Sequence, residues 1–287
     1  MTVTVPAYAK INLFLDICSI RENGYHNIKS YMQSVSLHDD VSVTISPAEK
    51  KKINIFCDNV DIPCDSSNLA YKAANAYPVV GDITIKIEKR IPMSAGLAGG
   101  SADCAAVLVA LNKLCGDKLA PDELCCLGSK LGADVPFCIR GGACLVEGIG
   151  EILTPKKSMP RFPLVIARKG EGMSTPLAYK ALDEKFNNFE GYISDFQKIE
   201  ALISDDDRVT AESYCKNLFN IFESVVEPER PCVTEIKRTM NAFGTAGTLM
   251  SGSGTAVFGI FEKEQDAQNA VEALKNDGAA AYLCYPV

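Results

Sequence analysis

A segment rich in glycine and other small residues stands out first. Residues Pro92–Ala102 read Pro-Met-Ser-Ala-Gly-Leu-Ala-Gly-Gly-Ser-Ala, between a strand-like segment, 83–87, and an apolar run, 104–111. Small residues let a backbone approach a ligand closely, and the N–H groups at a helix start attract anions. The segment predicts a loop that binds the phosphates of a nucleotide. From its composition alone, a tight turn packed on a helix is an equally weighted alternative.

The loop matches neither of the two common nucleotide signatures. It lacks the Gly-Lys-Ser/Thr of a Walker A loop, and its glycines do not fit G-x-G-x-x-G. Ser101 is placed to bond a phosphate oxygen or a magnesium-bound water. Lys86, Lys89 and Arg90 stand just upstream and add local positive charge, which an anionic ligand needs in a chain of net charge -7.

Hydrophobic periodicity and turn residues indicate the elements that position this loop. A mixed pattern of strands and helices results, with Ser66 and Ser67 as cap candidates for the first helix and residues 154–163 as the connection between two domains. We predict polar helix with loops over 183–210 and a glycine–serine turn over 247–254. The predicted strands cover 10–17, 41–45, 53–55, 83–87, 143–146, 164–167 and 256–261. The predicted helices cover 69–76, 101–114, Pro121 to near Gly132, 175–182, 211–226, 231–241 and 265–276.

Bulk composition excludes some functional classes. The chain has 287 residues, of which 47% are hydrophobic and 23% charged, as is ordinary for a soluble globular protein of two domains. Its net negative charge argues against general nucleic-acid binding. Residues 1–10 show no secretory pattern, and the apolar run 104–111 is too short to cross a bilayer. We therefore expect a cytoplasmic protein that binds neither nucleic acid nor membrane.

Cysteine is abundant but not arranged for metal or disulfides. The chain holds twelve cysteines without a C-x-x-C pair and only two histidines. Several cysteines, such as Cys104, Cys138 and Cys144, stand in apolar segments. This pattern predicts reduced cysteines that act as small hydrophobic residues.

Three motifs, in order, resemble those of the GHMP kinases. They are Ala9–Leu15, the loop Pro92–Ala102, and Met250–Phe258. Three further segments narrow the resemblance to the family of 4-diphosphocytidyl-2-C-methyl-D-erythritol kinases. These segments are Arg21–His26, Leu131–Phe137 and Glu147–Glu151. The resemblance runs from about Ala7 to about Phe261 and is weakest between Asp183 and Arg208.

The resemblance implies both a fold and an activity. The implied fold is α+β, with a ribosomal-protein-S5-like α/β domain over 1–155 and a ferredoxin-like domain over 156–287. The implied activity is ATP- and Mg²⁺-dependent phosphorylation of the 2-hydroxyl of 4-diphosphocytidyl-2-C-methyl-D-erythritol, a step of non-mevalonate isoprenoid synthesis. Its partner is then a small molecule carrying cytidine diphosphate, and the enzyme a monomer or homodimer.

Two residues carry the implied chemistry. Asp134 accepts the proton of the attacking hydroxyl, and Lys10 orients that hydroxyl and keeps Asp134 ionised. Without the resemblance, an aspartate before Val135-Pro136 is more typical of a turn or cap, and a lone lysine is usually solvated.

Binding roles are also implied residue by residue. The family loop is often richer in glycine than this one, which has Ser94, Ala95 and Ala98. Because these residues are small, close backbone approach survives if their φ angles are negative. The implied nucleotide contacts are Pro92, Met93, Ser94, Ala95, Gly96, Leu97, Ala98, Gly99, Gly100, Ser101 and Ala102, together with Asn68 and Lys89 near the adenine and its sugar. The implied substrate contacts are Asn12, Tyr25, His26, Tyr179, Ser251 and Gly252, and the implied metal contact is Ser101.

Two other functions stay open at this point. One is a GHMP kinase for another alcohol such as homoserine, against which the pair Tyr25-His26 argues, because homoserine has no base to stack. The other is a non-catalytic ligand-binding protein on the same fold. The presence of both Lys10 and Asp134 argues against it.

Overall fold

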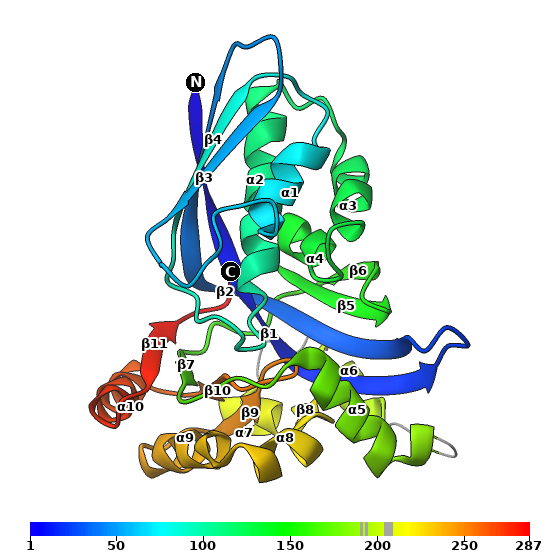
Figure 1. The fold of residues 1–287 in the computed structure, drawn as a ribbon. Coiled ribbons are helices and arrows are strands. Elements are labelled where there is room, and N and C mark those ends of the chain that lie inside the picture. Colours follow the sequence, from blue (N-terminus) through cyan, green and yellow to red (C-terminus); the bar gives the residue numbers. More distant parts are fainter. Residues whose placement is uncertain (190–191, 193–194, 204–208) are drawn as a thin grey trace. The chain divides into compact units, whose positions relative to one another are not determined.

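A computed structural model describes residues 1–189, 192, 195–203 and 209–287 (Figure 1). The chain forms two compact units. Unit 1 comprises residues 1–9, 37–91 and 98–141, and unit 2 comprises residues 10–36, 92–97 and 142–287. Two long strands, β1 (Thr2–Ile20) and β2 (His26–Ser46), contribute residues to each unit. None of the helices in the described part of the chain is long and apolar enough to span a membrane.

Unit 1 is a layer of strands with helices. Strand β3 (Lys52–Cys57) runs parallel to β4 (Asp82–Glu88), which pairs antiparallel with residues 40–46 of β2. The predicted alternation in β4 is confirmed, because Ile83, Ile85 and Ile87 are buried. Helix α1 (Leu69–Ala76) packs on α2 (Gly99–Leu114), and α2 packs on α3 (Pro121–Ser129) and α4 (Val135–Arg140).

Two local details of unit 1 differ from the sequence expectation. The cap of α1 is Asn68, whose Oδ1 accepts from the Ala70 N–H at 2.8 Å, rather than Ser66 or Ser67. Helix α4 is one turn and a half that the sequence did not predict. It starts after Asp134 with proline in its first turn, a position where proline is preorganised for helix.

Unit 2 contains a second group of paired strands. Strand β5 (Ala143–Gly148) pairs antiparallel with residues 28–33 of β2 and with β6 (Ile152–Lys156), while β8 (Phe219–Asn220) runs parallel to β1 at Phe14. The expected connection over 154–163 therefore begins inside β6. Its first residues form an edge strand that tolerates Pro155.

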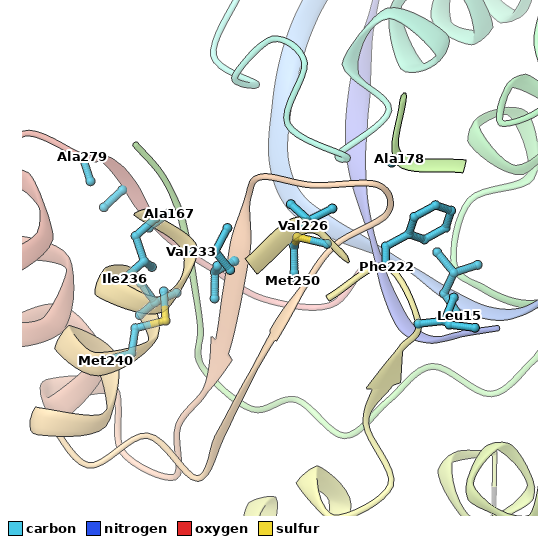
Figure 2. Packing of buried hydrophobic residues seen from close by; sticks show 14 of the residues in the cluster. Leu15, Ala167, Ala178, Phe222, Val226, Val233, Ile236, Met240, Met250 and Ala279 are labelled. Atoms are coloured by element: carbon cyan, nitrogen blue, oxygen red, sulfur yellow. The ribbon is translucent and has the colours of Figure 1, made fainter. Parts of the chain in front are cut away.

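The remaining strands of unit 2 form a four-stranded antiparallel sheet in the order β11-β7-β10-β9. The strands are β7 (Leu164–Arg168), β9 (Gly247–Met250), β10 (Val257–Ile260) and β11 (Ala280–Cys284). Helix α9 (Pro231–Ala242) precedes β9, and α10 (Glu264–Asn276) joins β10 to β11. This order with two helices is the ferredoxin-like arrangement, so the expected α+β class is confirmed. Figure 2 shows Ile236 and Met240 of α9 beside Ala167 of β7, within one buried apolar cluster.

Residues 211–226 do not form the single predicted helix. They contain α7 (Ala211–Cys215), strand β8 and the start of α8 (Glu223–Glu229). Pairing of β8 with β1 interrupts the helix, which local spacing could not reveal. Residues 247–250 are likewise strand rather than turn. In 183–210, helix and turn occur as expected in α5 (Thr175–Lys185), a 3-10 turn (Asn187–Phe189) and α6 (Gln197–Leu202). Residues 190–191, 193–194 and 204–208 lie outside the described part.

Candidate active site

The three sequence motifs meet in unit 2. The Lys10 N–H donates to the Leu97 carbonyl at 3.1 Å, and the Ala256 N–H donates to the Ala95 carbonyl at 3.0 Å. The Ser251 hydroxyl donates to the Gly96 carbonyl, also at 3.0 Å. Loop residues 92–97 are thus hydrogen-bonded to one segment about 85 residues earlier in the chain and to another about 155 residues later.

Glycine is required where the loop crosses the third motif. Gly96 has a φ of +76°, and a Cβ there would overlap the Ser251 carbonyl oxygen and lie 3.1 Å from the Gly254 nitrogen. Gly252 has a φ of +57°, and a Cβ there would lie 3.0 Å from Lys10 Nζ. The backbones therefore pass within contact distance of each other and of the lysine ammonium.

Lys10 is held inside unit 2. Only 4% of the residue is exposed, and its Nζ donates to Asn12 Oδ1 at 2.5 Å. Asn12 Nδ2 donates to Ser30 Oγ at 2.8 Å, and Ser30 Oγ donates to the Phe14 carbonyl at 2.7 Å. This chain of donors fixes the ammonium and the Asn12 amide together. Ser30 was missed by sequence reasoning, and its only signal was a polar residue inside a strand.

Two further residues that the sequence did not single out support the third motif. Asn220 Nδ2 donates to the carbonyls of Met250 and Gly252 at 2.7 and 2.8 Å, and the residue is 4% exposed. Glu223 Oε1 accepts from the Met250 N–H at 2.7 Å and from Lys237 Nζ at 2.5 Å. Both carbonyls that flank Ser251 are thereby fixed.

The start of α2 lies in unit 1. Ala98 occupies the cap position with a φ of +59°, and its carbonyl accepts from the Ala102 N–H at 2.9 Å. Alanine has no side-chain acceptor, so the first N–H groups of this helix receive no cap from it. Ser94 also has a positive φ, +49°. The condition of negative φ angles, set for close backbone approach, is therefore not met at these two residues. They adopt the left-handed turn that the loop needs, at a cost of about 1–2 kcal/mol each.

Asn68, Ser101 and Asp134 belong to the same unit. Asn68 caps α1 and donates from Nδ2 to the Pro63 carbonyl at 2.8 Å. The next residue, Leu69, lies close to α2, because its Cδ1 is 3.8 Å from where a Cβ on Gly100 would be. Ser101 Oγ lies 3.8 Å from the corresponding point on Gly132, two residues before Asp134. Asp134 is half-buried in the turn that opens α4. Three predicted residues thus come from segments that border the start of α2.

Lys89, which the resemblance places near the adenine and its sugar, lies in a buried group of charged side chains. Its Nζ donates to Asp39 Oδ2 and, at 2.8 Å, to Asp103 Oδ2, and all three side chains are at most 6% exposed. Burial would lower the pKa of Lys89, but the charges of Asp103 and Asp39 outweigh it and raise that pKa. Burial raises the pKa of Asp103 to about 7, with Lys89 opposing and Asp39 adding to the rise.

The predicted base-recognition residues lie in unit 2. The His26 and Tyr179 rings are 4.6 Å apart between centroids and tilted by 38°, and His26 Nε2 lies 2.6 Å from Asp183 Oδ1. Tyr25 is 60% exposed and follows the turn at Gly24. The structure therefore brings His26 and Tyr179 together and leaves the Tyr25 ring available for stacking.

Metal ligands from the protein are few. In the described ranges, His, Cys, Asp and Glu side chains do not gather in threes at metal-binding distance. Ser101 offers one hydroxyl at the start of α2. A donor set of this kind fits Mg²⁺ that arrives with polyphosphate and keeps several waters. The cysteines of the described residues are free thiols, of which Cys104, Cys144 and Cys284 are buried.

Comparisons with known proteins identify the family. The GHMP kinases N terminal domain matches residues 68–142, and the GHMP kinases C terminal domain matches residues 198–280. A 4-diphosphocytidyl-2-C-methyl-D-erythritol kinase of Caldicellulosiruptor saccharolyticus is 42% identical over 94% of this chain and 91% of its own length. That of Acetivibrio thermocellus is 41% identical over 96% and 95%.

Solved structures agree. A crystal structure of 4-(cytidine 5'-diphospho)-2C-methyl-D-erythritol kinase superposes with a TM-score of 0.80 at 33% identity, covering 99% of both chains. A homoserine kinase from Cytophaga hutchinsonii reaches a TM-score of 0.71 at 19% identity over 98% and 94% of the chains, a likeness of fold alone. With identity near 40% over almost the whole length and both GHMP domains matched, the chain belongs to the 4-diphosphocytidyl-2-C-methyl-D-erythritol kinase family of the GHMP kinases.

Proposed function

We propose that this protein transfers the γ-phosphoryl group of ATP to the 2-hydroxyl of 4-diphosphocytidyl-2-C-methyl-D-erythritol. The observation that carries the proposal is the meeting of three motifs around a buried lysine. The Lys10 ammonium lies against the backbone of Gly252. The backbone N–H of the same lysine donates to the carbonyl of loop residue Leu97. A buried cation beside a phosphate-binding loop suits a reaction that depends on charge stabilisation and positioning.

Loop residues 92–102 hold the triphosphate. Their glycines and small residues allow close backbone approach, and the uncapped N–H groups at the start of α2 point toward anionic oxygens. Ser101 contacts a phosphate oxygen or a metal-bound water. Asn68 and Lys89 border the adenine and its sugar, and Mg²⁺ bound with the nucleotide neutralises charge on the phosphates.

Asp134 and Lys10 act on the acceptor. The substrate hydroxyl forms a bond to the γ-phosphorus as the bond from that phosphorus to the bridging oxygen of ADP breaks. Asp134 accepts the hydroxyl proton. Lys10, oriented by Asn12, holds the hydroxyl oxygen and stabilises the charge that develops on it.

The cytidyl end of the substrate is held in unit 2. The exposed Tyr25 ring offers a stacking surface for the base. Tyr179, which packs against His26, stands on the other side of the base, and His26 offers polar groups for the base edge. Asn12 contacts the erythritol hydroxyls, and Ser251 and Gly252 contact the substrate phosphates. We also propose a cytoplasmic monomer or homodimer with domains over 1–155 and 156–287.

An ADP-release assay with a panel of alcohols tests the proposal. The panel contains 4-diphosphocytidyl-2-C-methyl-D-erythritol, its uridine counterpart and homoserine, each with ATP and Mg²⁺. We expect turnover with the cytidyl substrate at least about 100-fold above homoserine, since a site built for a base leaves polar groups unpaired without it. Turnover of homoserine alone, or of none of the three, would overturn it.

A further inference from the structure

Three charged residues inside unit 1 form a buried group. Lys89 alone has a role in the proposed function, and the group as a whole has none. Asp39 on β2, Lys89 after β4 and Asp103 on α2 form a chain of two ion pairs, with side chains 0%, 4% and 6% exposed. Two carboxylates share one ammonium, so the group carries excess negative charge when all three are ionised. Among the described residues, none hydrogen-bonds to Asp103 Oδ1.

The group is attached to the backbone just before the phosphate loop. Asp39 Oδ1 accepts from the N–H groups of Arg90 and Ile91 at 2.5 and 2.8 Å. These residues immediately precede Pro92, where the loop starts. The carboxylate therefore fixes the direction in which the chain enters the loop.

The same group is attached to the helix just after the loop. Asp103 lies five residues beyond the cap Ala98 and accepts from Lys89 Nζ at 2.8 Å. A Cβ on Gly99 would lie 3.1 Å from Ile91 Cγ2 and 3.4 Å from Lys89 Nζ. The residues on either side of 92–98 are thus joined through a single lysine.

The desolvation free energy lost by burying such charged side chains can exceed what their ion pairs gain. Well-packed apolar side chains of similar volume are often as stabilising as buried ion pairs. They would not, however, accept two backbone N–H groups or set the direction of the chain. Directional hydrogen bonds define a geometry that apolar packing leaves loose.

We infer that Asp39 and Asp103 are positioning residues for the phosphates of ATP, which act through Lys89 by holding the two ends of loop 92–98 at a set spacing. The inference rests on the proposed function, in which this loop binds the triphosphate. A positioning role and a purely structural role predict different effects of losing the group. Loss of the group weakens binding of the triphosphate more than binding of the nucleoside, which Lys89 also borders in the proposed function.

Calorimetric titration of the full chain with ATP and, separately, with adenosine tests the inference. For Asp39→Ala we expect ATP affinity to fall about tenfold, the effect of losing roughly one net hydrogen bond. Adenosine affinity should fall less, by about threefold at most, because Asp103 still holds Lys89 beside the nucleoside. Asp39→Asn keeps an acceptor for both N–H groups but turns an amide N–H donor toward Lys89 Nζ, so it should recover only part of the ATP affinity. Asp103→Asn, which keeps an acceptor for Lys89, should fall about threefold.

Asp40→Ala is the matched control. Asp40 is the next residue and pairs at 2.7 Å with the half-exposed Arg90 guanidinium, but it does not hold the backbone. We expect wild-type ATP affinity from it. Circular dichroism melting identifies any variant that fails to fold. If Asp39→Ala fails to fold, the ATP affinities of Asp39→Asn and Asp103→Asn test the inference instead.

The outcomes separate this inference from the proposed function. Wild-type protein that binds no ATP would overturn both. ATP binding that is unchanged in folded Asp39→Ala would overturn the inference alone. An equal loss of ATP and adenosine affinity would also overturn it, because it would assign the group to the base site or to general stability.

Discussion

Replacing Gly96 by alanine places a methyl group where the phosphate loop crosses the third motif. A Cβ at this position would overlap the Ser251 carbonyl oxygen and lie 2.9 Å from the Ser251 carbonyl carbon. Both neighbours are backbone atoms, so no side chain can rotate away. The loop and the Ser251 turn must separate by roughly 1 Å, a displacement large enough to affect phosphoryl transfer strongly.

The expected cost has two parts. A left-handed alanine costs about 1 kcal/mol net of the entropy that it removes from the unfolded chain. Separation of the two segments stretches the bonds from Ser251 Oγ to the Gly96 carbonyl and from the Ala256 N–H to the Ala95 carbonyl. These add about 2 kcal/mol. We expect Gly96→Ala to lower the free energy of unfolding by about 3 kcal/mol and kcat/KM by about 100-fold.

Gly116→Ala provides the matched control. Gly116 has a φ of +80°, and a Cβ there would have nothing within 4 Å. It shares the backbone cost of about 1 kcal/mol without the overlap. Urea unfolding and ADP release are measured for both variants. A backbone overlap at Gly96 is refuted if Gly96→Ala is no less stable than Gly116→Ala and keeps kcat/KM within about threefold of wild type.

Three further outcomes are expected. Asp134→Asn should lower kcat about 100- to 10,000-fold with little change in the KM for ATP, since it removes a proton acceptor; wild-type turnover would exclude Asp134 as the base. Asn220→Asp should lower stability by about 2–3 kcal/mol, because a buried carboxylate faces the Met250 and Gly252 carbonyls; unchanged urea unfolding would contradict this. In the native protein at pH 8, iodoacetamide should modify exposed Cys64 and spare Cys284, because burial raises the pKa of the Cys284 thiol to about 12 and keeps it protonated; equal modification by peptide mass mapping would refute it.

Local pattern was sufficient for many elements of this protein. Helix α1 spans the predicted Leu69–Ala76, α9 and α10 lie within a residue or two of their predicted bounds, and the alternation of β4 is buried as expected. These elements bury one clear face each, so their period is visible in the residues themselves. The segment 211–226 failed because pairing of β8 with β1, a distant strand, overrides its helical spacing.

The candidate site divides in the same way. The motifs around Lys10, Pro92–Ala102 and Ser251 are visible in the sequence, because the chemistry of phosphate binding restricts them to small residues and a cation. Their meeting at Gly96 and Gly252 depends on main-chain contacts between segments far apart in the chain. The positive φ of Ala98 was also invisible, because alanine rarely adopts that conformation and the surrounding structure imposes it.

By itself, the sequence determined the family, the nature of the phosphate loop and the identity of the residues that are candidates for the chemistry. Only the tertiary structure decided what holds them. Asn220, Ser30, Asp39 and Asp103 are polar residues that the sequence did not single out, and Lys89 was singled out only as a positive charge near the nucleotide. Burial removes water as their alternative hydrogen-bond partner, so each must bond to whatever backbone or charge the fold brings beside it.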